Sequence, residues 1–166
     1  MNYIHNLSAI VAMDTQKGIG LNNKLPWHYK KDLLWFKQKT INKKIIMGRN
    51  TFQSILQQNN NELLSQRQHI VLSKQDIQHP NVIFFNKFFD IINEVQENPS
   101  QEYVLIGGAQ LYNTALPLVN NLYLTKIKKQ YPCDTFIDID KYPFHAAKTY
   151  YDYTEDDLNF TVYKRS

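Results

Sequence analysis

The 166-residue sequence contains one cysteine, Cys133, and only five glycines and six prolines. A single cysteine excludes an internal disulfide and is typical of proteins from a reducing compartment. The apolar run nearest the N-terminus, Leu7–Met13, is too short for a signal-peptide core or a membrane span. We therefore expect a cytoplasmic protein that has no membrane partner.

Motifs of several common site classes are also missing. The lysines and arginines are scattered without a dense basic run, so nucleic acid is not expected as the main partner, although the net charge of +4 favours a small anion such as phosphate or carboxylate. The five histidines show no metal-ligand spacing, and no metal is expected. The G-x-G-x-x-G fingerprint is absent, which excludes an ordinary Rossmann dinucleotide site.

The composition, 43% hydrophobic and 20% charged, is that of an ordinary globular chain, and its length favours one domain over 1–166. Short apolar runs that read as strands alternate with helical patterns through the first two thirds; these runs are 7–13, 44–48, 69–73, 82–85, 103–107 and 122–127. This alternation predicts a single-domain α/β fold with a mainly parallel central sheet and helices on both faces. Alternating segments at 148–152 and 160–164 predict a C-terminal antiparallel hairpin.

Three connecting segments carry further expectations. Residues 14–23 are polar and contain two glycines, which predicts a flexible loop suited to act as a lid. Residues 56–66 are asparagine-rich and without periodicity, which predicts a surface loop. Pro117 is expected to end the helix that follows Gly107 and Gly108.

One carboxylate stands on a face that should be buried. The stretch Leu25–Lys37 begins as a turn and continues as a helix after Pro26. At 100° per residue, Asp32 shares the inward face with Leu33 and Phe36, and Trp35 lies at its edge. An acid in a first helical turn commonly complements the dipole or caps the helix. The alternative is a carboxylate in a largely apolar cleft that binds a protonatable ligand.

Two strand ends have the composition of phosphate-binding corners. Gly48 and Arg49 follow an apolar strand and open a helix, so backbone N–H groups and a positive charge converge there. Gly107 and Gly108 also separate a strand from a helix, which allows a pyrophosphate to approach the backbone. Each pattern also occurs at ordinary turns. In a parallel sheet, ligand sites lie beyond the carboxyl ends of the strands, so both corners and Asp32 should share one rim.

Taken in order along the chain, these motifs resemble dihydrofolate reductase. The matching segments are Ile10-Val11-Ala12, Gly18-Ile19-Gly20, Leu25-Pro26-Trp27 with Asp32-Leu33 and Phe36-Lys37, Met47-Gly48-Arg49 with Thr51-Phe52-Gln53-Ser54-Ile55, Ile106-Gly107-Gly108 with Leu111-Tyr112, and Leu124-Thr125. The resemblance implies NADPH-dependent reduction of 7,8-dihydrofolate to 5,6,7,8-tetrahydrofolate, by hydride transfer to C6 and protonation at N5 promoted by Asp32. It also implies antifolate inhibitors as ligands, and we expect a monomer.

The resemblance also implies the roles of individual residues. The catalytic residues implied are Asp32, Thr125, which bonds this carboxylate, and Trp27. The substrate-binding residues implied are Ile10, Val11, Ala12, Leu33, Phe36, Ile55, Leu64, Ile106 and Tyr112, with Arg67 on the α-carboxylate of the glutamate tail. The NADPH-binding residues implied are Ala12, Gly18, Ile19, Gly20, Leu21, Asn22, Asn23, Lys24, Gly48, Arg49, Asn50, Thr51, Ser73, Lys74, Gly107, Gly108, Ala109, Gln110, Leu111, Tyr112, Asn113 and Thr114. The family joins its two glycines by a cis peptide, and its Leu-Pro-Gly-Arg pattern is replaced here by Leu64-Ser65-Gln66-Arg67.

Three other interpretations remain at this stage. A reductase of another nitrogen heterocycle, such as the pyrimidine reductases of flavin synthesis, would keep the NADPH corners but need not keep Asp32, Phe36 and Arg67 together. A non-catalytic nucleotide-binding module would explain the glycine corners, yet it gives no reason for an acid on an apolar face. A basic nucleic-acid-binding domain conflicts with the scattered charges.

Overall fold

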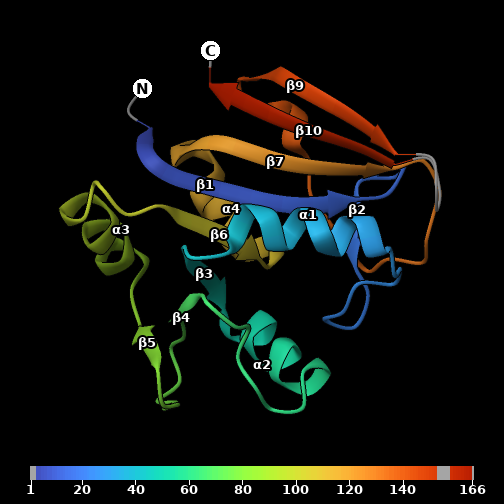
Figure 1. Cartoon of the computed structure of the whole chain (residues 1–166). Coiled ribbons are helices and arrows are strands. Elements are labelled where there is room, and N and C mark those ends of the chain that lie inside the picture. The colour runs from blue at the N-terminus through green and yellow to red at the C-terminus, as the bar shows by residue number, and fades with distance from the viewer. Residues whose placement is uncertain (1–2, 153–157, 166) are drawn as a thin grey trace.

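The computed structural model describes residues 3–152 and 158–165, and within them eight strands form one sheet in the order β5-β4-β3-β6-β1-β7-β10-β9 (Figure 1). The strands are β1 (Ile4–Met13), β3 (Lys44–Gly48), β4 (Gln68–Leu72), β5 (Val82–Phe85), β6 (Tyr103–Gly107), β7 (Val119–Ile127), β9 (Phe144–Asp152) and β10 (Leu158–Arg165). Neighbours from β5 through β7 pair in parallel, whereas β10 pairs antiparallel with β7 and β9. The predicted parallel sheet with a C-terminal antiparallel hairpin is confirmed.

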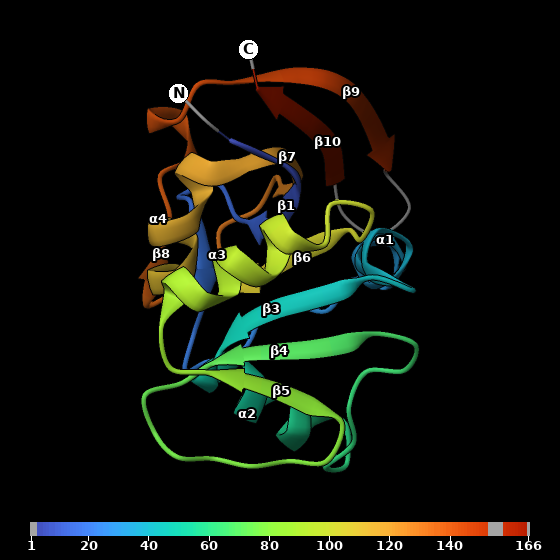
Figure 2. The ribbon, with the colours of Figure 1, turned by 90° about the vertical axis from the view of Figure 1, so that its left-hand side faces the viewer.

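Helices cover both faces of this sheet (Figure 2). On one face lie α1 (Lys30–Thr40) and α2 (Arg49–Gln58), and on the other lie α3 (Phe88–Glu97) and α4 (Ala109–Ala115). Successive strand residues supply both layers: in β3, Ile45 packs with Phe52 of α2, while Ile46 belongs to the core under α3 and α4. Burial on both faces explains why these strands read as continuous apolar runs.

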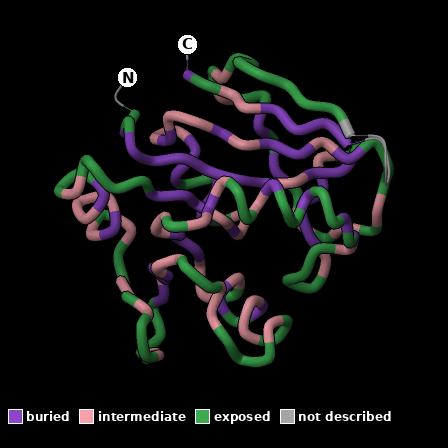
Figure 3. The backbone as a smooth tube through the Cα atoms, viewed as in Figure 1, coloured by how far each residue is buried: buried purple, intermediate pink, exposed green. Residues whose placement is uncertain are grey.

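The central strands form the buried part of the molecule (Figure 3). In β1, Leu7 and Ala9 are fully buried on the side of α3 and α4, and Ile10 packs with Trp35 on the side of α1. The outer strand β9, by contrast, carries exposed side chains such as Tyr150 and Tyr151. The parallel strands that end at the candidate site are therefore held in the most buried part of the fold.

Residues 14–23, predicted as a loop, include a short strand. β2 (Gly18–Gly20) pairs antiparallel with β8 (Thr135–Phe136), a short strand in the segment that follows β7. The buried carboxylate of Asp14 accepts hydrogen bonds from the N–H of Gly18 at 2.8 Å and of Tyr131 at 2.9 Å. The prediction was wrong here because the pairing of β2 with β8 and the bond from Tyr131 to Asp14 join segments more than a hundred residues apart, which local composition does not reveal.

One helix end differs from expectation, and another agrees with it. α2 continues to Gln58, whereas the surface loop was expected to begin at residue 56; the Gln58 amide reaches back to Ser54 Oγ at 2.6 Å. α4 ends at Ala115, and Pro117 lies in a 3-10 turn, η1 (Leu116–Leu118). Pro is tolerated there because the first N–H groups of a helix have no intrahelical partner. A second short 3-10 turn, η2 (Ile139–Lys141), follows β8.

Candidate active site

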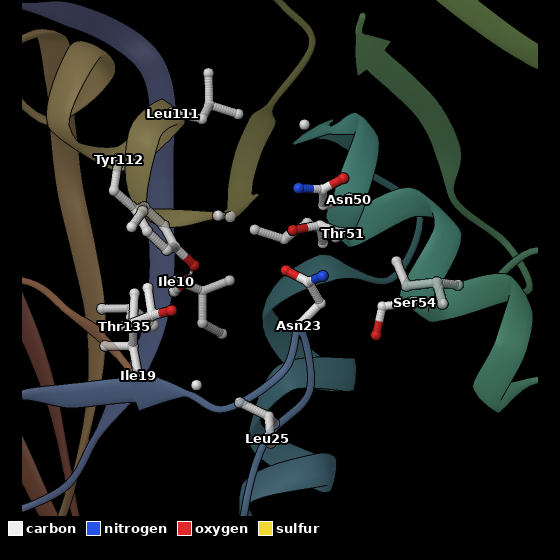
Figure 4. Close-up of a pocket in the computed structure, with 18 of the residues that line it drawn as sticks. Ile10, Ile19, Asn23, Leu25, Asn50, Thr51, Ser54, Leu111, Tyr112 and Thr135 are labelled. Carbon is white, nitrogen blue, oxygen red and sulfur yellow. Dashed lines mark hydrogen bonds between the residues drawn. The ribbon is translucent and has the colours of Figure 1, made fainter. Parts of the chain in front are cut away.

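A cavity of about 1080 Å³ opens at the carboxyl ends of the parallel strands. It is lined by residues from β1, β2, β3, β4, β6, β7 and β8, from α1, α2, α4 and the first residue of α3, and from the segments that connect them. In Figure 4, Ile10 and Tyr112 lie on one side and Asn50 and Thr51 of α2 on the other, with Asn23 drawn below Thr51. The shared rim expected from the sequence therefore exists.

Most of the predicted site residues line this cavity. They are Ile10, Val11, Ala12, Ile19, Gly20, Asn23, Lys24, Asp32, Leu33, Phe36, Gly48, Arg49, Asn50, Thr51, Ile55, Leu64, Arg67, Ser73, Lys74, Ile106, Gly107, Gly108, Ala109, Gln110, Leu111, Tyr112, Thr114 and Thr125. Five predicted residues are not in the lining: Gly18, Leu21, Asn22, Trp27 and Asn113. Trp27 is buried with its ring edge-on to Tyr131 at 5.4 Å between centroids, so it lies behind the lining.

Several lining residues were not predicted. They are Leu25, Lys37, Ser54, Gln58, Asn59, Leu72, Gln75, Phe88 and Thr135. Ser54 follows Asn50 and Thr51 at helical spacing, so the face of α2 was a signal that could have identified it. Thr135 carries no such signal, because only the pairing of β8 with β2 brings it to the cavity.

Asp32 and Thr125 form a buried pair inside this cavity. Asp32 is 8% exposed in the first turn of α1, and Thr125 is 1% exposed in β7. The Thr125 hydroxyl donates a hydrogen bond to Asp32 Oδ1 over 2.7 Å. Asp32 is thus held against the sheet by a residue of β7. The geometry supports the cleft interpretation over a helix cap.

The buried face of α1 differs in detail from the predicted one. Trp35, expected at the edge, is 8% exposed, while Leu33 is 48% exposed at the cavity rim. The Trp35 ring packs against Phe160 of β10 at 5.1 Å between centroids. Helical periodicity alone does not show that Trp35 is more buried than Leu33. The burial of Trp35 depends on the size of its indole ring and on its contact with the Phe160 ring of β10.

Tyr112 ties α4 to β1 at one wall of the cavity. Its hydroxyl donates to the carbonyl oxygen of Ile10 over 2.5 Å, and both residues line the cavity. Burial raises the pKa of Tyr112 far above its usual value of 10.0. The phenol therefore stays protonated and remains a hydrogen-bond donor over the whole working range of pH.

The two glycine corners differ in what their backbone requires. Gly107 has φ +125°, which side-chain-bearing residues rarely adopt, and the implied cis peptide between Gly107 and Gly108 is present. Gly48 has an ordinary φ of −79°, and a Cβ built on it would meet no protein atom within 4 Å. Packing within the protein therefore does not explain the glycine at Gly48, whereas close approach of a ligand to this corner would.

The charge of the lining is strongly asymmetric. Basic side chains come from five residues, and among the residues described Asp32 is the one acidic side chain in the lining. The basic residues are Lys24, Lys37, Arg49, Arg67 and Lys74. Such a lining favours a ligand that carries several negative charges together with one group that meets a carboxylate.

No helix within residues 3–152 and 158–165 is long and apolar enough to cross a membrane. Nor do these residues bring three or more His, Cys, Asp or Glu side chains together in a group that could hold a metal ion.

Comparisons with known proteins agree with this geometry. Residues 6–165 match the family model of dihydrofolate reductase. The chain is 43% identical over 132 residues to dihydrofolate reductase of Buchnera aphidicola subsp. Baizongia pistaciae, covering 79% of this chain and 76% of that protein. It is 42% identical over 129 residues to that of Haemophilus influenzae, covering 78% of this chain and 76% of that protein.

A solved structure shows the same fold. Dihydrofolate reductase from Enterococcus faecalis, complexed with NADP(H) and RAB-propyl, superposes with a TM-score of 0.86 at 29% sequence identity. The match covers 100% of this chain and 99% of that chain. On the extent of the family match, and on relatives above 40% identity, the chain belongs to the dihydrofolate reductase family.

Proposed function

We propose that this chain, as one domain and as a monomer, catalyses the NADPH-dependent reduction of 7,8-dihydrofolate to 5,6,7,8-tetrahydrofolate. The observation that carries the proposal is the buried pair of Asp32 and Thr125 in a cavity whose cationic lining residues are Lys24, Lys37, Arg49, Arg67 and Lys74. A pterin with an amidine-like edge matches the carboxylate, and the anionic groups of substrate and cofactor match the basic residues. Antifolate inhibitors are expected to bind at the same cavity.

The pterin is assigned to the space between Asp32 and β1. The hydrogen of the Thr125 hydroxyl is directed to Asp32, so its oxygen can still accept a bond from the pterin. Backbone carbonyls of Ile10, Val11 and Ala12 are assigned to the ring amines. The apolar side chains at the cavity that we assign to the pterin and benzoyl rings are Leu33, Phe36, Ile55, Leu64 and Ile106.

Arg67 is assigned to the carboxylate of the glutamate tail. Its Nε donates to the Ser65 carbonyl at 2.8 Å, and its Nη1 donates to Thr40 Oγ1 at 3.0 Å. These bonds use two of the five guanidinium N–H groups, and no described residue takes the other three. A planar guanidinium held in this way can still bind a carboxylate through two parallel hydrogen bonds.

The glycine corners fit NADPH. The open space over Gly48 and the positive φ of Gly107 suit a close backbone approach of the ligand at both corners. Arg49, Asn50, Thr51, Ser73 and Lys74 line the cavity beside Gly48, and we assign Arg49 and Lys74 to the 2′-phosphate. When bound, NADPH supplies the hydride that is transferred to C6 of the substrate.

The remaining tasks of the chain are placement, exclusion of water and protonation. Hydride transfer requires the reacting carbons to lie about 3–3.5 Å apart, so the cavity must hold both rings face to face. Ile19 and Asn23 line the cavity and come from the segment assigned as the lid over the nicotinamide. Asp32 is assigned the promotion of protonation at N5, because it is the acidic group buried beside the pterin position.

Optical measurement of NADPH oxidation tests this function directly. The wild type should oxidise NADPH in the presence of dihydrofolate, and Asp32→Asn should lose on the order of a hundredfold or more in kcat/KM at neutral pH. A flavin-pathway pyrimidine substrate, assayed in parallel, should give no turnover. Absence of wild-type turnover with dihydrofolate, or an unimpaired Asp32→Asn, would overturn the proposal.

A further inference from the structure

His69 joins the two ends of the turn that leads from α2 to β4. Its side chain is completely buried, in β4 between Ile45 of β3 and Val82 of β5. The N–H of Leu64 donates to His69 Nε2 over 3.2 Å, and His69 Nδ1 lies 3.2 Å from the carbonyl oxygen of Arg67. Because Nε2 accepts a bond, the proton is assigned to Nδ1, which then donates to the carbonyl.

This arrangement requires a neutral ring with one donor and one acceptor. A protonated imidazole would point an N–H at the N–H of Leu64, so protonation would break one of the two bonds. Burial, with smaller contributions from the charges of Arg67 and His79, holds the pKa of His69 below its usual value of 6.5. The ring is thus neutral at pH 7, as the two contacts demand.

The two residues held by His69 line the cavity. Leu64 contributes an apolar side chain, and Arg67 contributes the guanidinium assigned to the substrate carboxylate. From the other side, the end of α1 and the residues just after it hold the same turn: Thr40 accepts a bond from Arg67 Nη1 at 3.0 Å, and the N–H of Asn42 donates to the Gln66 carbonyl at 2.8 Å. The turn is therefore fixed between the end of α1 and the imidazole.

We propose that His69 is a positioning residue that places Arg67 and Leu64, and thereby sets how tightly the carboxylate-bearing tail of the substrate is held. This inference rests on the proposed function, since it concerns the substrate of the same cavity. His69 touches neither the cavity nor the reacting atoms. It acts by fixing the backbone at both ends of a four-residue turn, whose middle residue Gln66 has a φ of +58°.

A purely structural histidine would behave differently from a positioning one. If His69 only filled the core, its replacement would lower stability and affect all substrates alike. If it places Arg67, the loss should concern substrates that carry the tail and should disappear when Arg67 is removed. A 7,8-dihydropterin that lacks the benzoylglutamate group separates these cases, because it has no carboxylate for Arg67.

The experiment compares steady-state kinetics of the wild type, His69→Leu and His69→Asn on dihydrofolate and on this tail-less dihydropterin, with NADPH saturating. In His69→Leu the KM for dihydrofolate should rise about tenfold, as expected for one weakened charge-assisted hydrogen bond, while kcat stays within about twofold. The KM for the dihydropterin should stay unchanged. His69→Asn should recover most of the loss, because an amide also offers one donor and one acceptor.

Two controls isolate the path through Arg67. His79→Leu changes a histidine of the adjacent loop that contacts Phe52 and Pro80 without lining the cavity, and both KM values should stay at wild-type level. In an Arg67→Ala background, His69→Leu should change the KM for dihydrofolate by less than about twofold, since the two substitutions remove one shared interaction. If His69→Leu raised the KM for dihydrofolate by the same factor in the Arg67→Ala background as in the wild type, the inference would be overturned.

The outcomes separate the two proposals. Absence of wild-type turnover on dihydrofolate overturns the proposed function and this inference with it. Wild-type turnover, combined with equal KM rises on both substrates in His69→Leu, overturns this inference alone. If His69→Leu does not fold, His69→Gln replaces it: its longer side chain displaces the donor and the acceptor, and the KM should rise about threefold on dihydrofolate only.

Discussion

The hydroxyl of Thr125 donates a hydrogen bond to Oδ1 of Asp32 over 2.7 Å, although 93 residues separate them in the chain. Asp32 stands in the first turn of α1, and Thr125 stands in β7, directly beside Ala12 of β1. Both side chains are buried and both line the cavity. The helix thus supplies the carboxylate and the sheet supplies the donor that orients it.

Thr125→Val tests this bond, because it removes the hydroxyl while keeping the shape of the side chain. A hydrogen bond to a charged group contributes about 1.5–3 kcal/mol, so kcat/KM for dihydrofolate should fall on the order of tenfold to a hundredfold. Thr125→Ser keeps the hydroxyl and should stay close to wild type. Equal activity of Thr125→Val and wild type would show that the bond does not orient Asp32.

Gly48→Ala tests the assignment of its corner to NADPH. A Cβ at this position meets no protein atom within 4 Å, and φ is −79°, so the free energy of unfolding should change by less than about 1 kcal/mol. The KM for NADPH should rise several-fold, because the new methyl group occupies the approach of the ligand. Kinetics with varied NADPH and urea unfolding together measure both effects.

Gly18→Ala is the matched control for this variant. Its Cβ would lie 2.5 Å from Cys133 Sγ and 2.7 Å from Cys133 Cβ, so the surrounding structure must shift. Overpacking of this kind costs about 1–3 kcal/mol of stability. The assignment would be contradicted if Gly18→Ala lowers the stability as expected but Gly48→Ala leaves the KM for NADPH unchanged. The cofactor would then have no reason to be placed at Gly48.

Asp14→Asn should destabilise the anchor of the segment that contains β2. Burial raises the pKa of Asp14, but hydrogen bonds from the N–H groups of Tyr131, Gly18 and Gln16 outweigh it and leave the pKa below the usual 3.8. The asparagine NH₂ group would face at least one of these donors. An unsatisfied buried donor costs about 1–3 kcal/mol, which urea unfolding at neutral pH should detect.

The pH dependence of this difference has a definite sign. Because folding lowers the pKa of Asp14, the ionised carboxylate stabilises the folded state above the unfolded pKa of 3.8, and this contribution is lost as pH falls through the lower, folded value. The difference in unfolding free energy between wild type and Asp14→Asn should therefore shrink as pH falls from about 5 through 3.8 to about 3. A difference that stays constant over this range would contradict the assignment.

Gln66→Gly should stabilise the protein. In the described part of the chain, six of the eight non-glycine residues with positive φ are asparagines, which tolerate this region, and Gln66 at +58° is one of the two exceptions. Glycine removes the strain of the left-handed backbone conformation but costs more backbone entropy on folding. The net effect should raise the unfolding free energy by about 0.5–1 kcal/mol, and the melting temperature should rise with it. Asn42→Gly, at φ +60°, should gain less.

The sequence predicted an element accurately where residues close in the chain determine it, and less accurately where a distant strand does. The strands Lys44–Gly48 and Val82–Phe85 were predicted to the residue, because each is a short apolar run between polar neighbours. β7 begins at Val119 instead of residue 122, since its added residues pair with β1 in a sheet that the local pattern does not describe. β2 and β8 were missed for the same reason, as each exists only through the other.

The sequence by itself determined the rim of the site: helical periodicity after Pro26 placed Asp32 inward, and strand, glycine and helix in succession placed Gly48 and Gly107 at one edge. Only the tertiary structure decided which side chains meet there. Thr125 reaches Asp32 and Tyr112 reaches Ile10, both through contacts between elements that sequence spacing does not relate. Periodicity sets the direction of a side chain along its own element, whereas its partner depends on how the elements pack together.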